Sequence, residues 1–584
     1  MPAAPRNVMS MPGIASFTEE LCVGSLRWDL VHPFPTQDHR DRAVGDTVVK
    51  DALAFLTEHV DPTLVDATSE LPADLVDGLR SRGLLDLTVE EDLGGLGLSP
   101  YNAFRVVEAA ASWSMAIGLL LATQNGIGAG AFAGALPAGP LRDYVRGRVA
   151  DGVVSGVADT EPSGQANARR QTTATPTEDG TAYLLSGEKI HISNAPIADL
   201  LAVTATVTEA DSTQTRLFFT DTSAPGFRVE AGHEFMGVKG FPNGRLVLDG
   251  VRVPRDRMLV EEAPGRHTPE LTFLLMKGRL HIVVAPSLAI AKRGVRWARE
   301  FALRRRIDGC GLGEYEAVRR NIADSVADVF ALESVAEWVM LADHASGRIN
   351  PRLEQLAAKN IASIACWRVV ERTMSLLAAE GFETARSKAA RGAAPIPLER
   401  AFRDARGLRI WGGVDFLLDN WFAQLVIFSY HYPDRAGPGA SVAAGIDAAG
   451  LSGRNRDHLL FVAEQARTFA DACSRLARRY PEPEQLYTKQ TTLITTSRIL
   501  GELLTMSLVL ARASRLADEE INDVQDVADV YCCAARHRLA GWWRRLSDDG
   551  QPDHAAVAAR WLRGDPTEMF ANDVVPHVPT GAAR

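Results

Sequence analysis

The sequence predicts an α+β protein in which a central β domain lies between helical regions. Three observations lead to this prediction. Apolar residues recur at helical spacing over residues 48–149, short apolar runs separated by turn residues fill residues 152–260, and helical spacing returns after residue 270. The chain has 584 residues, 46% of them hydrophobic, which is enough to bury several hydrophobic cores. About three or four domains are therefore expected.

The N-terminal part divides into two predicted segments. Residues 1–46 are rich in proline and turn formers and lack a sustained hydrophobic period, so we expect a loosely packed extension. Residues 47–150 are predicted to form an α-helical domain, because their apolar residues follow the helical period. The glycine-rich stretch 91–98 does not follow it and is predicted to be a loop between helices.

The central β domain is predicted over residues 151–265. Short apolar runs in this region are bounded by Gly, Asp, Asn and Pro, the residues that separate strands. These runs lie at 182–185, 200–203, 216–219 and 245–248.

Two helical regions follow. Residues 266–432 are predicted to form a helical-bundle domain with a loop at Pro395 and Pro397. Residues 433–584 are predicted to hold a Gly- and Ala-rich linker and then an appended α-helical domain, because an apolar stripe reappears there at helical spacing. Its members are Leu459, Val462, Ala466, Phe469, Cys473 and Leu476. A second long apolar helix is expected over 493–516, and the domain is expected to cover the core or a partner subunit.

Composition and charge limit the cellular compartment and the classes of binding partner that we expect for this protein. A net charge of -10 with both signs interspersed argues against a nucleic-acid surface. The six cysteines lack the spacing of a metal or redox motif, which predicts no metal site and a reducing cytoplasm. The start of the chain lacks a basic segment followed by an apolar run, and we find no unbroken apolar stretch of membrane length. We therefore expect a cytoplasmic protein without a membrane span.

An ordered set of motifs accompanies this organisation. The β region contains Thr160-Glu161-Pro162 with Gly164, then Leu185-Ser186-Gly187-Glu188-Lys189, Ile192-Ser193-Asn194-Ala195 and Gly237-Val238-Lys239-Gly240. The helical part contains Arg305 with Gly309, and later Arg403-Asp404-Ala405. Over roughly residues 48–430 the order and spacing of these motifs resemble the acyl-CoA dehydrogenase superfamily.

The resemblance implies a fold, a cofactor and a binding site. It implies an acyl-CoA dehydrogenase-like order of domains, with FAD between the β domain and the helical bundle and an acyl thioester beside the flavin. Thr160 would lie at the flavin ring and Ser193 near flavin N5, where a hydroxyl can donate to the charge that forms. Arg305 resembles the arginine of the family's arginine-glycine element and is expected to bind the cofactor. Gly413 and Val414 replace a glycine-threonine pair whose positions help hold the adenine end of FAD, partly from a neighbouring subunit, and the resemblance implies a homo-dimer or homo-tetramer. Thr160 and Ser193 could instead be turn residues that cap strands.

The catalytic position of the family is vacant in this sequence. Gly412 stands where the family has the glutamate that removes a proton next to the thioester carbonyl, and Gly278 stands at the alternative position that some relatives use. A carboxylate is the usual base for such a weakly acidic proton, and glycine cannot act as one. Arg279, beside the second position, could hold a carboxylate, a thioester oxygen or an oxyanion.

Two histidines near these motifs are further candidates. His191 replaces the aromatic residue, typically Trp, that flanks the flavin in the family. An imidazole there could stack or exchange a proton near neutral pH, or it could simply fill a smaller gap. His281 lies two residues after Arg279 and is expected to point elsewhere on the helix.

Without the glutamate, three routes of substrate activation are open. A β-keto acid can lose CO2 and form the enolate equivalent with no proton to remove. Reduced flavin can react with oxygen, which is then transferred to the substrate. His191 or Asp415 can serve as a new base. The first two routes are combined in the epoxyketone synthases of secondary metabolism, which this chain resembles in overall length, appended helical domain and vacant base position.

The predicted function is therefore that of an FAD-dependent oxidoreductase. We expect a decarboxylating dehydrogenase-monooxygenase that acts on a β-keto acid or acyl thioester in natural-product biosynthesis, with molecular oxygen as a partner. The substrate could be carried on CoA, on a carrier protein or on neither. A conventional acyl-CoA dehydrogenase with a relocated base and a non-catalytic flavin-binding scaffold are the alternatives.

One glycine-rich motif matches a nucleotide-binding pattern but is not expected to bind a nucleotide. The glycine-rich stretch 126–131 matches a loose dinucleotide-binding pattern, but no strand is predicted before it. We expect its small residues to allow close packing between helices.

Overall fold

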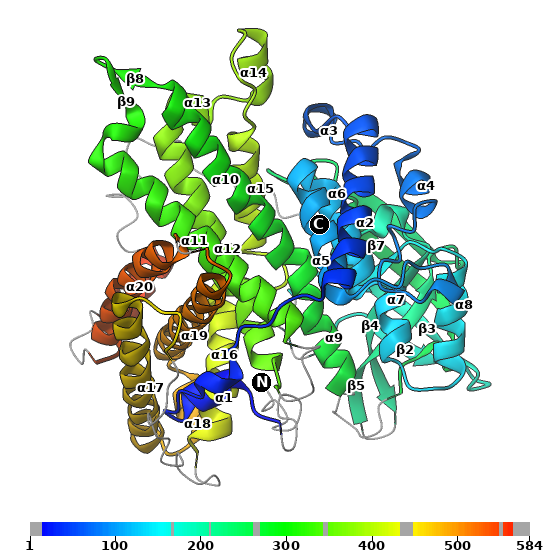
Figure 1. Cartoon of the computed structure of the whole chain (residues 1–584). Helices are drawn as coiled ribbons and strands as arrows, with labels where there is room; N and C mark the ends of the chain where they lie inside the picture. The colour runs from blue at the N-terminus through cyan, green and yellow to red at the C-terminus, as the bar shows by residue number, and fades with distance from the viewer. Residues whose placement is uncertain are drawn as a thin grey trace.

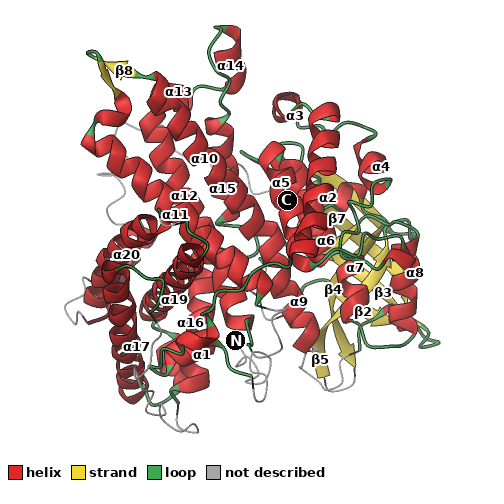
Figure 2. Cartoon of the chain, in the orientation of Figure 1, coloured by secondary structure: helices red, strands yellow, loops and turns green. Residues whose placement is uncertain are grey.

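The structure is a computed structural model that describes residues 14–164, 167, 169–209, 212–260, 269–342, 349–432, 448–521, 523–547 and 553–564. The strands of the seven-stranded sheet gather at one end of the molecule, and the long helices of the second half of the chain fill the other end (Figures 1 and 2). The predicted α+β class, with helices before and after a central β region, is confirmed.

Helices form the first part of the chain, before the sheet. They are α1 (Phe17–Cys22), α2 (His39–His59), α3 (Pro62–Thr68), α4 (Leu75–Arg80), α5 (Pro100–Trp113), α6 (Met115–Ile127), α7 (Ala129–Ala135) and α8 (Pro140–Ala150). Several begin where the sequence provides a cap: Asp38, Asp61 and Ser99 accept hydrogen bonds from the first free backbone N–H groups of α2, α3 and α5. The predicted loop at 91–98 is a short turn and coil between α4 and α5.

The described strands of the β region form one seven-stranded mixed sheet in the order β1-β4-β2-β3-β7-β6, with β5 paired to β4. The bounds are β1 (Ser155–Ala158), β2 (Thr173–Pro176), β3 (Ala182–Ser193), β4 (Leu200–Glu209), β5 (Ser212–Asp221), β6 (Phe227–Gly232) and β7 (Asn243–Pro254). The pairings of β4 with β1 and β2 are parallel, and the remaining ones are antiparallel.

An irregularity in the central strand pair positions part of the site. The register between β3 and β7 shifts between Lys189 and Ile192, and His191 within this stretch has a positive φ of 57°. Such a bulge leaves residues outside the ladder and changes the direction of their side chains. The strand is therefore locally rearranged at Ile190 and His191, and regular pairing resumes at Ile192 and Ser193.

A helical bundle follows the sheet. Its elements are α9 (Pro269–Arg279), a π-helical segment (Leu280–Val284), α10 (Ala285–Arg304), the short hairpin β8 (Arg306–Ile307) and β9 (Cys310–Gly311), α11 (Glu316–Leu341), α12 (Arg352–Leu377), α13 (Ala379–Phe382), α14 (Ala385–Ala390), α15 (Leu398–Leu408) and α16 (Asp415–Tyr430). The predicted loop at Pro395 and Pro397 separates α14 from α15.

The appended helices are α17 (Gly453–Arg479), α18 (Pro483–Tyr487), α19 (Gln490–Asp518), α20 (Val524–Ser547) and α21 (His554–Arg563). The predicted stripe lies along α17, and its members are buried except Leu476, which is half-buried. The second predicted apolar helix is α19, which packs against α11, α16, α17 and α20. The appended helices thus cover the bundle, as expected.

The prediction of a loosely packed N-terminal extension is wrong for the described part of that segment. Phe17, Leu21 and Cys22 are fully buried, and α1 packs against α12, α16, α17 and α19. Figure 1 shows α1 in blue beside α16 and α17. The segment is too short to show a hydrophobic period, and its partners lie hundreds of residues away, so sequence spacing could not reveal this packing.

A buried carboxyl group fastens α1 to the bundle. Glu354 on α12 is fully buried and accepts hydrogen bonds from the Ser16 hydroxyl (2.9 Å) and the Thr18 backbone N–H (2.7 Å). Burial raises the pKa of Glu354 to about 7 against the effect of these bonds. At pH 8 the folded protein therefore contains a buried carboxylate whose solvation is incomplete.

We expect the pH dependence of stability to change in the Glu354→Gln variant. A carboxyl group whose pKa is raised on folding stabilises the fold in its protonated form, and this contribution is lost as pH rises from the unfolded pKa through about 7. The lost contribution is about 3 kcal/mol at most. The variant should melt like the wild type at pH 5 and at a higher temperature at pH 8. If the variant and the wild type had the same melting temperature at pH 8 as well as at pH 5, this account would be contradicted.

Three described segments are long and apolar enough to cross a membrane by length and composition: Met115–Ala135, Leu274–Arg304 and Gln490–Asp518. The sequence analysis did not identify them. In the fold, 83%, 72% and 78% of their most apolar windows are buried inside the protein. A helix that is apolar on most sides is typical of either a membrane span or the interior of a large protein, and packing inside this fold accounts for these three.

Candidate active site

Both vacant base positions lie next to one arginine. The turn 411–414 between α15 and α16 contains Gly412 with φ of 66° and Gly413 with φ of 106°, values that side-chain-bearing residues rarely adopt. Arg279, the last residue of α9, donates from Nε to the Gly412 carbonyl oxygen at 2.7 Å. Because Gly278 precedes Arg279, the sequence-predicted residues Gly278, Arg279 and Gly412 are brought together.

One hydrogen-bond donor of Arg279 is unused within the described residues beside the Gly412 turn. Its Nη1 atom is buried and has no hydrogen-bond partner among the described residues. Burial lowers the pKa of Arg279 to about 10, so the guanidinium still carries its charge at neutral pH. A buried cation with an unused N–H group can bind the oxygen of a carboxylate or an enolate.

A buried lysine supports the same turn from the other side. Lys359 on α12 is fully buried, and its Nζ donates to the carbonyl oxygen of Gly413 at 2.7 Å. Burial is the main cause that lowers its pKa to about 8. The sequence analysis missed Lys359, although a single cation in the apolar run Leu356-Ala357-Ala358-Lys359 was a visible signal.

Packing leaves no room for a side chain at the second vacant position, Gly278. A Cβ atom at Gly278 would lie 2.3 Å from the Ile127 side chain and 2.9 Å from the Gly126 carbonyl oxygen. The helices α6 and α9 are in contact there, so the stretch 126–131 allows close helix packing, as predicted. Gly278 is therefore a packing residue, whereas the three atoms nearest to a Cβ at Gly412 all belong to Arg279, the first at an ordinary contact distance of 3.4 Å.

We expect the Gly278→Glu variant to be destabilised and inactive. The new side chain must push α9 away from α6, and overpacking of this kind costs about 1–3 kcal/mol. Gly278→Ala should show part of the same loss in melting temperature, because the clash begins at Cβ. A Gly278→Glu variant as stable as the wild type would contradict this assignment.

His281 is buried and does not face the Gly412 turn. It is 6% exposed, lies in the π-helical segment, and its Cβ lies 3.3 Å from the Cβ position of Gly126 on α6. Burial, with a smaller effect of Lys277, lowers its pKa to about 4, so the imidazole is neutral at pH 7. The prediction that His281 points elsewhere is confirmed.

Aromatic rings connect His191 with the Gly412 turn. The His191 and His233 rings lie 4.6 Å apart, and the His191 and Phe235 rings 6.0 Å apart. Phe235 in turn lies 6.1 Å from Trp411, the neighbour of Gly412. Burial, followed by the nearby His233, lowers the pKa of His191, which keeps it neutral at pH 7. Sequence spacing did not indicate His233, Phe235 and Trp411, because the loop after β6 and the turn before α16 meet only in the fold.

Thr160 and Ser193 flank His191 at the end of β3. The Thr160 carbonyl accepts a hydrogen bond from the Ile190 backbone N–H at 2.9 Å, while Ser193 ends the strand. Both residues are half-buried, and neither hydroxyl has a hydrogen-bond partner among the described residues. These side chains are therefore available to a ligand, together with His191.

A buried ion pair holds this edge in place. Lys189, fully buried, donates to the Glu161 carboxylate at 2.9 Å, and Glu161 is 1% exposed. Glu161 also accepts from the backbone N–H groups of Gln171 at 2.6 Å and Thr172 at 2.9 Å. The pair thus connects the residue after Thr160 with the strand that leads to His191.

The remaining predicted cofactor residues lie elsewhere in this chain. Arg305 is exposed at the end of α10, next to β8, and Figure 1 shows β8 far from β3, at the opposite end of the molecule. Gly413 binds Lys359 through its carbonyl, and the Val414 carbonyl accepts from Leu418 at the start of α16. One chain therefore does not bring Arg305 together with Thr160 and Ser193.

Asp415 has a structural role, because its carboxylate is bound by Arg409 and by the start of α16. Burial opposes its ionisation, but the hydrogen bond from Arg409 outweighs burial and holds the pKa of Asp415 below its ordinary value. Arg409 Nε donates to the carboxylate at 2.9 Å, and the Phe416 backbone N–H donates at 2.8 Å. Of the two relocated bases considered, His191 alone keeps a free proton-accepting role in the described structure.

Comparison with known proteins agrees with these observations. Three family models match the chain in order: the acyl-CoA dehydrogenase N-terminal domain over residues 45–135, the middle domain over 156–251 and the C-terminal domain over 271–420. The probable acyl-CoA dehydrogenase FadE10 of Mycobacterium tuberculosis is 32% identical over 404 residues, which are 68% of this chain and 61% of the relative. The human very long-chain specific acyl-CoA dehydrogenase is 27% identical over 415 residues, 69% of this chain and 61% of that protein.

Solved structures share the fold. An acyl-CoA dehydrogenase from Bacillus anthracis, complexed with FAD, has a TM-score of 0.72 at 19% identity and covers 93% of this chain and 94% of its own. Butyryl-CoA dehydrogenase from Megasphaera elsdenii has a TM-score of 0.56 at 23% identity and covers 66% of this chain and 97% of its own. The first match extends into the appended helices. This chain spans about three fifths of the curated relatives it matches, and it belongs to the acyl-CoA dehydrogenase superfamily.

Proposed function

We propose that this protein is an FAD-dependent oxidoreductase that activates a β-keto acid or acyl thioester by decarboxylation instead of with a catalytic carboxylate. The observation that supports this proposal is the contact between Arg279 and Gly412. Where the family has a base, this chain has a glycine beside a half-buried cation whose buried Nη1 group has no partner among the described residues. Such a site favours a substrate that itself carries the negative charge.

The chemistry of the substrate then replaces the base. The bond between the α-carbon and the carboxyl group breaks, CO2 leaves, and the electron pair remains as an enolate. Arg279 would orient the carboxylate and then donate from Nη1 to the enolate oxygen as charge develops there. No proton has to be removed, which agrees with glycine at both positions.

The residues present fit FAD as the cofactor. The unpartnered hydroxyls of Thr160 and Ser193 and the ring of His191 lie together at the end of β3, where the family's flavin would contact them. FAD would supply a two-electron acceptor for desaturation of the substrate. Because Arg305 lies far from this edge in its own chain, it would serve the cofactor of a second copy in a homo-dimer or homo-tetramer.

Molecular oxygen would complete the reaction as co-substrate. Desaturation removes two hydrogens, and one O2 can take them up as water while its other oxygen atom forms an epoxide. The atoms and electrons of the overall reaction therefore balance without an added reductant. The product would be an epoxyketone, and the protein would act among the cytoplasmic enzymes of natural-product biosynthesis, with the substrate free or carried on CoA or a carrier protein.

The deciding experiment presents the FAD-loaded protein with an α,α-disubstituted β-keto acid and, separately, with a simple acyl-CoA. We expect the keto acid to lose CO2 and two hydrogens and to gain one oxygen under air, as followed by product mass. Without oxygen, flavin bleaching should stop at one equivalent. If neither substrate bleaches the flavin, the non-catalytic scaffold is the correct description.

A carboxylate restored at position 412 should redirect the enzyme. In Gly412→Glu, the Cβ atom at position 412 makes only ordinary contact with Arg279, although the left-handed backbone costs a side-chain-bearing residue about 1–2 kcal/mol. We expect acyl-CoA dehydrogenation to appear and decarboxylation to fall, because the new carboxylate would occupy the Arg279 donor. Gly412→Ala carries the same backbone cost without a carboxylate and should gain no dehydrogenation.

A conventional dehydrogenase with a relocated base is the second candidate. The neutral His191, joined to the Gly412 turn through Phe235 and Trp411, favours it. It predicts wild-type turnover of simple acyl-CoA that rises as the imidazole loses its proton and is lost in His191→Phe. Turnover of the keto acid alone would exclude it.

A further inference from the structure

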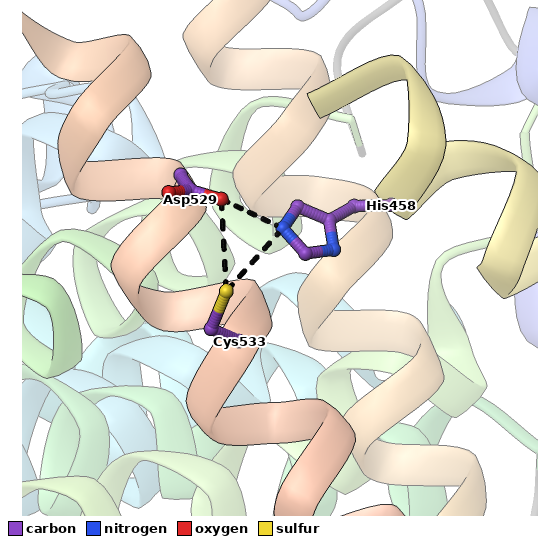
Figure 3. Close-up of side chains that lie close together, drawn as sticks. All are labelled: His458, Asp529 and Cys533. Atoms are coloured by element: carbon purple, nitrogen blue, oxygen red, sulfur yellow. Dashed lines mark hydrogen bonds and ion pairs between the residues drawn. The ribbon is translucent and has the colours of Figure 1, made fainter. Parts of the chain in front are cut away.

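A second group of chemically active side chains lies in the appended helices. His458 on α17 meets Asp529 and Cys533 on α20, as Figure 3 shows. Nε2 of His458 lies 2.9 Å from Asp529 Oδ1 and 3.8 Å from Cys533 Sγ, and the sulfur lies 3.6 Å from the same carboxylate oxygen. His458 is 4% exposed, and the other two residues are half-buried.

We propose that His458, Asp529 and Cys533 bind a divalent transition-metal ion, with zinc as the best chemical match. Nitrogen, sulfur and oxygen ligands from His, Cys and Asp are those that zinc takes, at bond lengths of about 2.0–2.3 Å. Tetrahedral ligands at such lengths stand about 3.3–3.6 Å apart. The three separations in this cluster lie within a few tenths of an ångström of that range.

The helices present the ligands from both sides of the site. Asp529 and Cys533 are four residues apart on α20, which places both side chains on one helix face. His458 closes the site from α17, and the two helices contact each other. Because His458 lies 71 residues before Asp529, the sequence shows no metal-binding spacing, and no metal is predicted from it.

Neighbouring arginines shape the carboxylate and the imidazole. Arg454 binds both oxygens of Asp529, with Nε 3.0 Å from Oδ1 and Nη2 3.0 Å from Oδ2, and its Nη2 lies 3.8 Å from Cys533 Sγ. Its side chain is largely exposed, so it can turn away from Oδ1 and the sulfur when a metal binds. Arg536 approaches Nδ1 of His458 at 3.4 Å and stacks on Phe461 at 4.3 Å. Since arginine only donates, Nδ1 is an acceptor and Nε2 carries the proton that points to Asp529.

Metal binding must rearrange these protons. The Cys533 thiol releases its proton to solvent and bonds the metal as thiolate, while the imidazole proton moves from Nε2 to Nδ1. Arg536 then has to leave Nδ1, which its exposed position allows. Cys533 and Arg536 also line a surface cavity between α17 and α20, together with Gln465, which gives the ion a path and the fourth ligand position a water.

The bound ion would join α17 to α20. Its role would be structural, because the cluster lies in the appended helices and not among the β3 residues or the Gly412 turn. A ligand that binds only the folded form raises the melting temperature with its concentration. The proposal does not depend on the proposed redox function.

The test uses the full-length protein, stripped with a chelator and then titrated with Zn²⁺ alone by calorimetry. We expect one site per chain, and Cys533→Ser should weaken binding at least about 100-fold. Cys310→Ser is the matched control, because Cys310 is a half-buried thiol outside the cluster, and it should bind zinc like the wild type. Equal zinc uptake by the wild type and Cys533→Ser would overturn the proposal.

Cobalt provides a readout that does not depend on stability. Co²⁺ bound to a thiolate gives a sulfur-to-metal charge-transfer absorption, which should be present in the wild type and in Cys310→Ser and absent in Cys533→Ser. Asp529→Asn keeps the side-chain shape and should retain the band with weaker affinity. A wild-type spectrum without the charge-transfer band would also exclude the site.

Discussion

Replacement of Arg279 by methionine is expected to lower turnover of a β-keto acid by about 10²–10³-fold. Arg279 is half-buried beside Gly412, and its buried Nη1 atom, which has no partner among the described residues, is the donor we propose at the point where negative charge would develop. Methionine fills a similar volume but cannot donate. Steady-state release of CO2 by the FAD-loaded variant measures the effect, and Arg279→Lys should retain an intermediate rate because it restores a point charge.

Loss of the bond to Gly412 could also loosen the turn, so a matched variant is needed. Lys359→Met removes the other side-chain hydrogen bond to this turn, the one to the Gly413 carbonyl, and leaves Arg279 in place. If Arg279 acts on the substrate, Lys359→Met should reduce turnover much less than Arg279→Met. Equal losses in the two variants would show that Arg279 only supports the turn.

Replacement of Lys189 by methionine is expected to destabilise the protein by about 3–5 kcal/mol. The variant leaves the Glu161 carboxylate buried, with the backbone N–H groups of Gln171 and Thr172 but without its cation. Chemical denaturation monitored by circular dichroism gives the free energy of unfolding. FAD affinity should fall as well, because Thr160 precedes the unpaired carboxylate and lies at the flavin edge that we propose.

The double variant Lys189→Met with Glu161→Gln provides the control. It removes the charge together with its partner, and exchanging both members of a buried pair is often close to neutral. The double variant should therefore recover most of the lost stability. A double variant as unstable as Lys189→Met would mean that packing of the lysine side chain, and not the unpaired charge, causes the loss.

The ordered motifs predicted more of the site than any single residue could. Thr160, His191 and Ser193 meet at the end of β3, and Gly278, Arg279 and Gly412 meet at the turn before α16. Each of these residues lies within a local motif with fixed spacing, so sequence order was enough to name them as candidates. Arg305 is different, because its own chain places it at the other end of the molecule.

Residues without a motif stayed hidden until the fold was known. Lys359 supports the Gly412 turn from a helix more than 50 residues earlier, and the His233, Phe235 and Trp411 rings converge from separate loops. The N-terminal helix α1 is fastened by Glu354, which lies 336 residues from Thr18. Such contacts depend on the packing of distant segments, which local periodicity does not encode.

The sequence by itself determined the class of the fold, the order of its helical and β regions and the absence of a carboxylate at positions 278 and 412. These properties follow from hydrophobic period and residue identity, which are local. Only the tertiary structure decided that a Cβ at Gly278 would collide with Gly126 and Ile127 whereas one at Gly412 would not, and that Arg279 keeps a donor without a partner in the described part of the chain. The physical reason is that a glycine's role depends on what surrounds its missing side chain, and packing alone sets those surroundings.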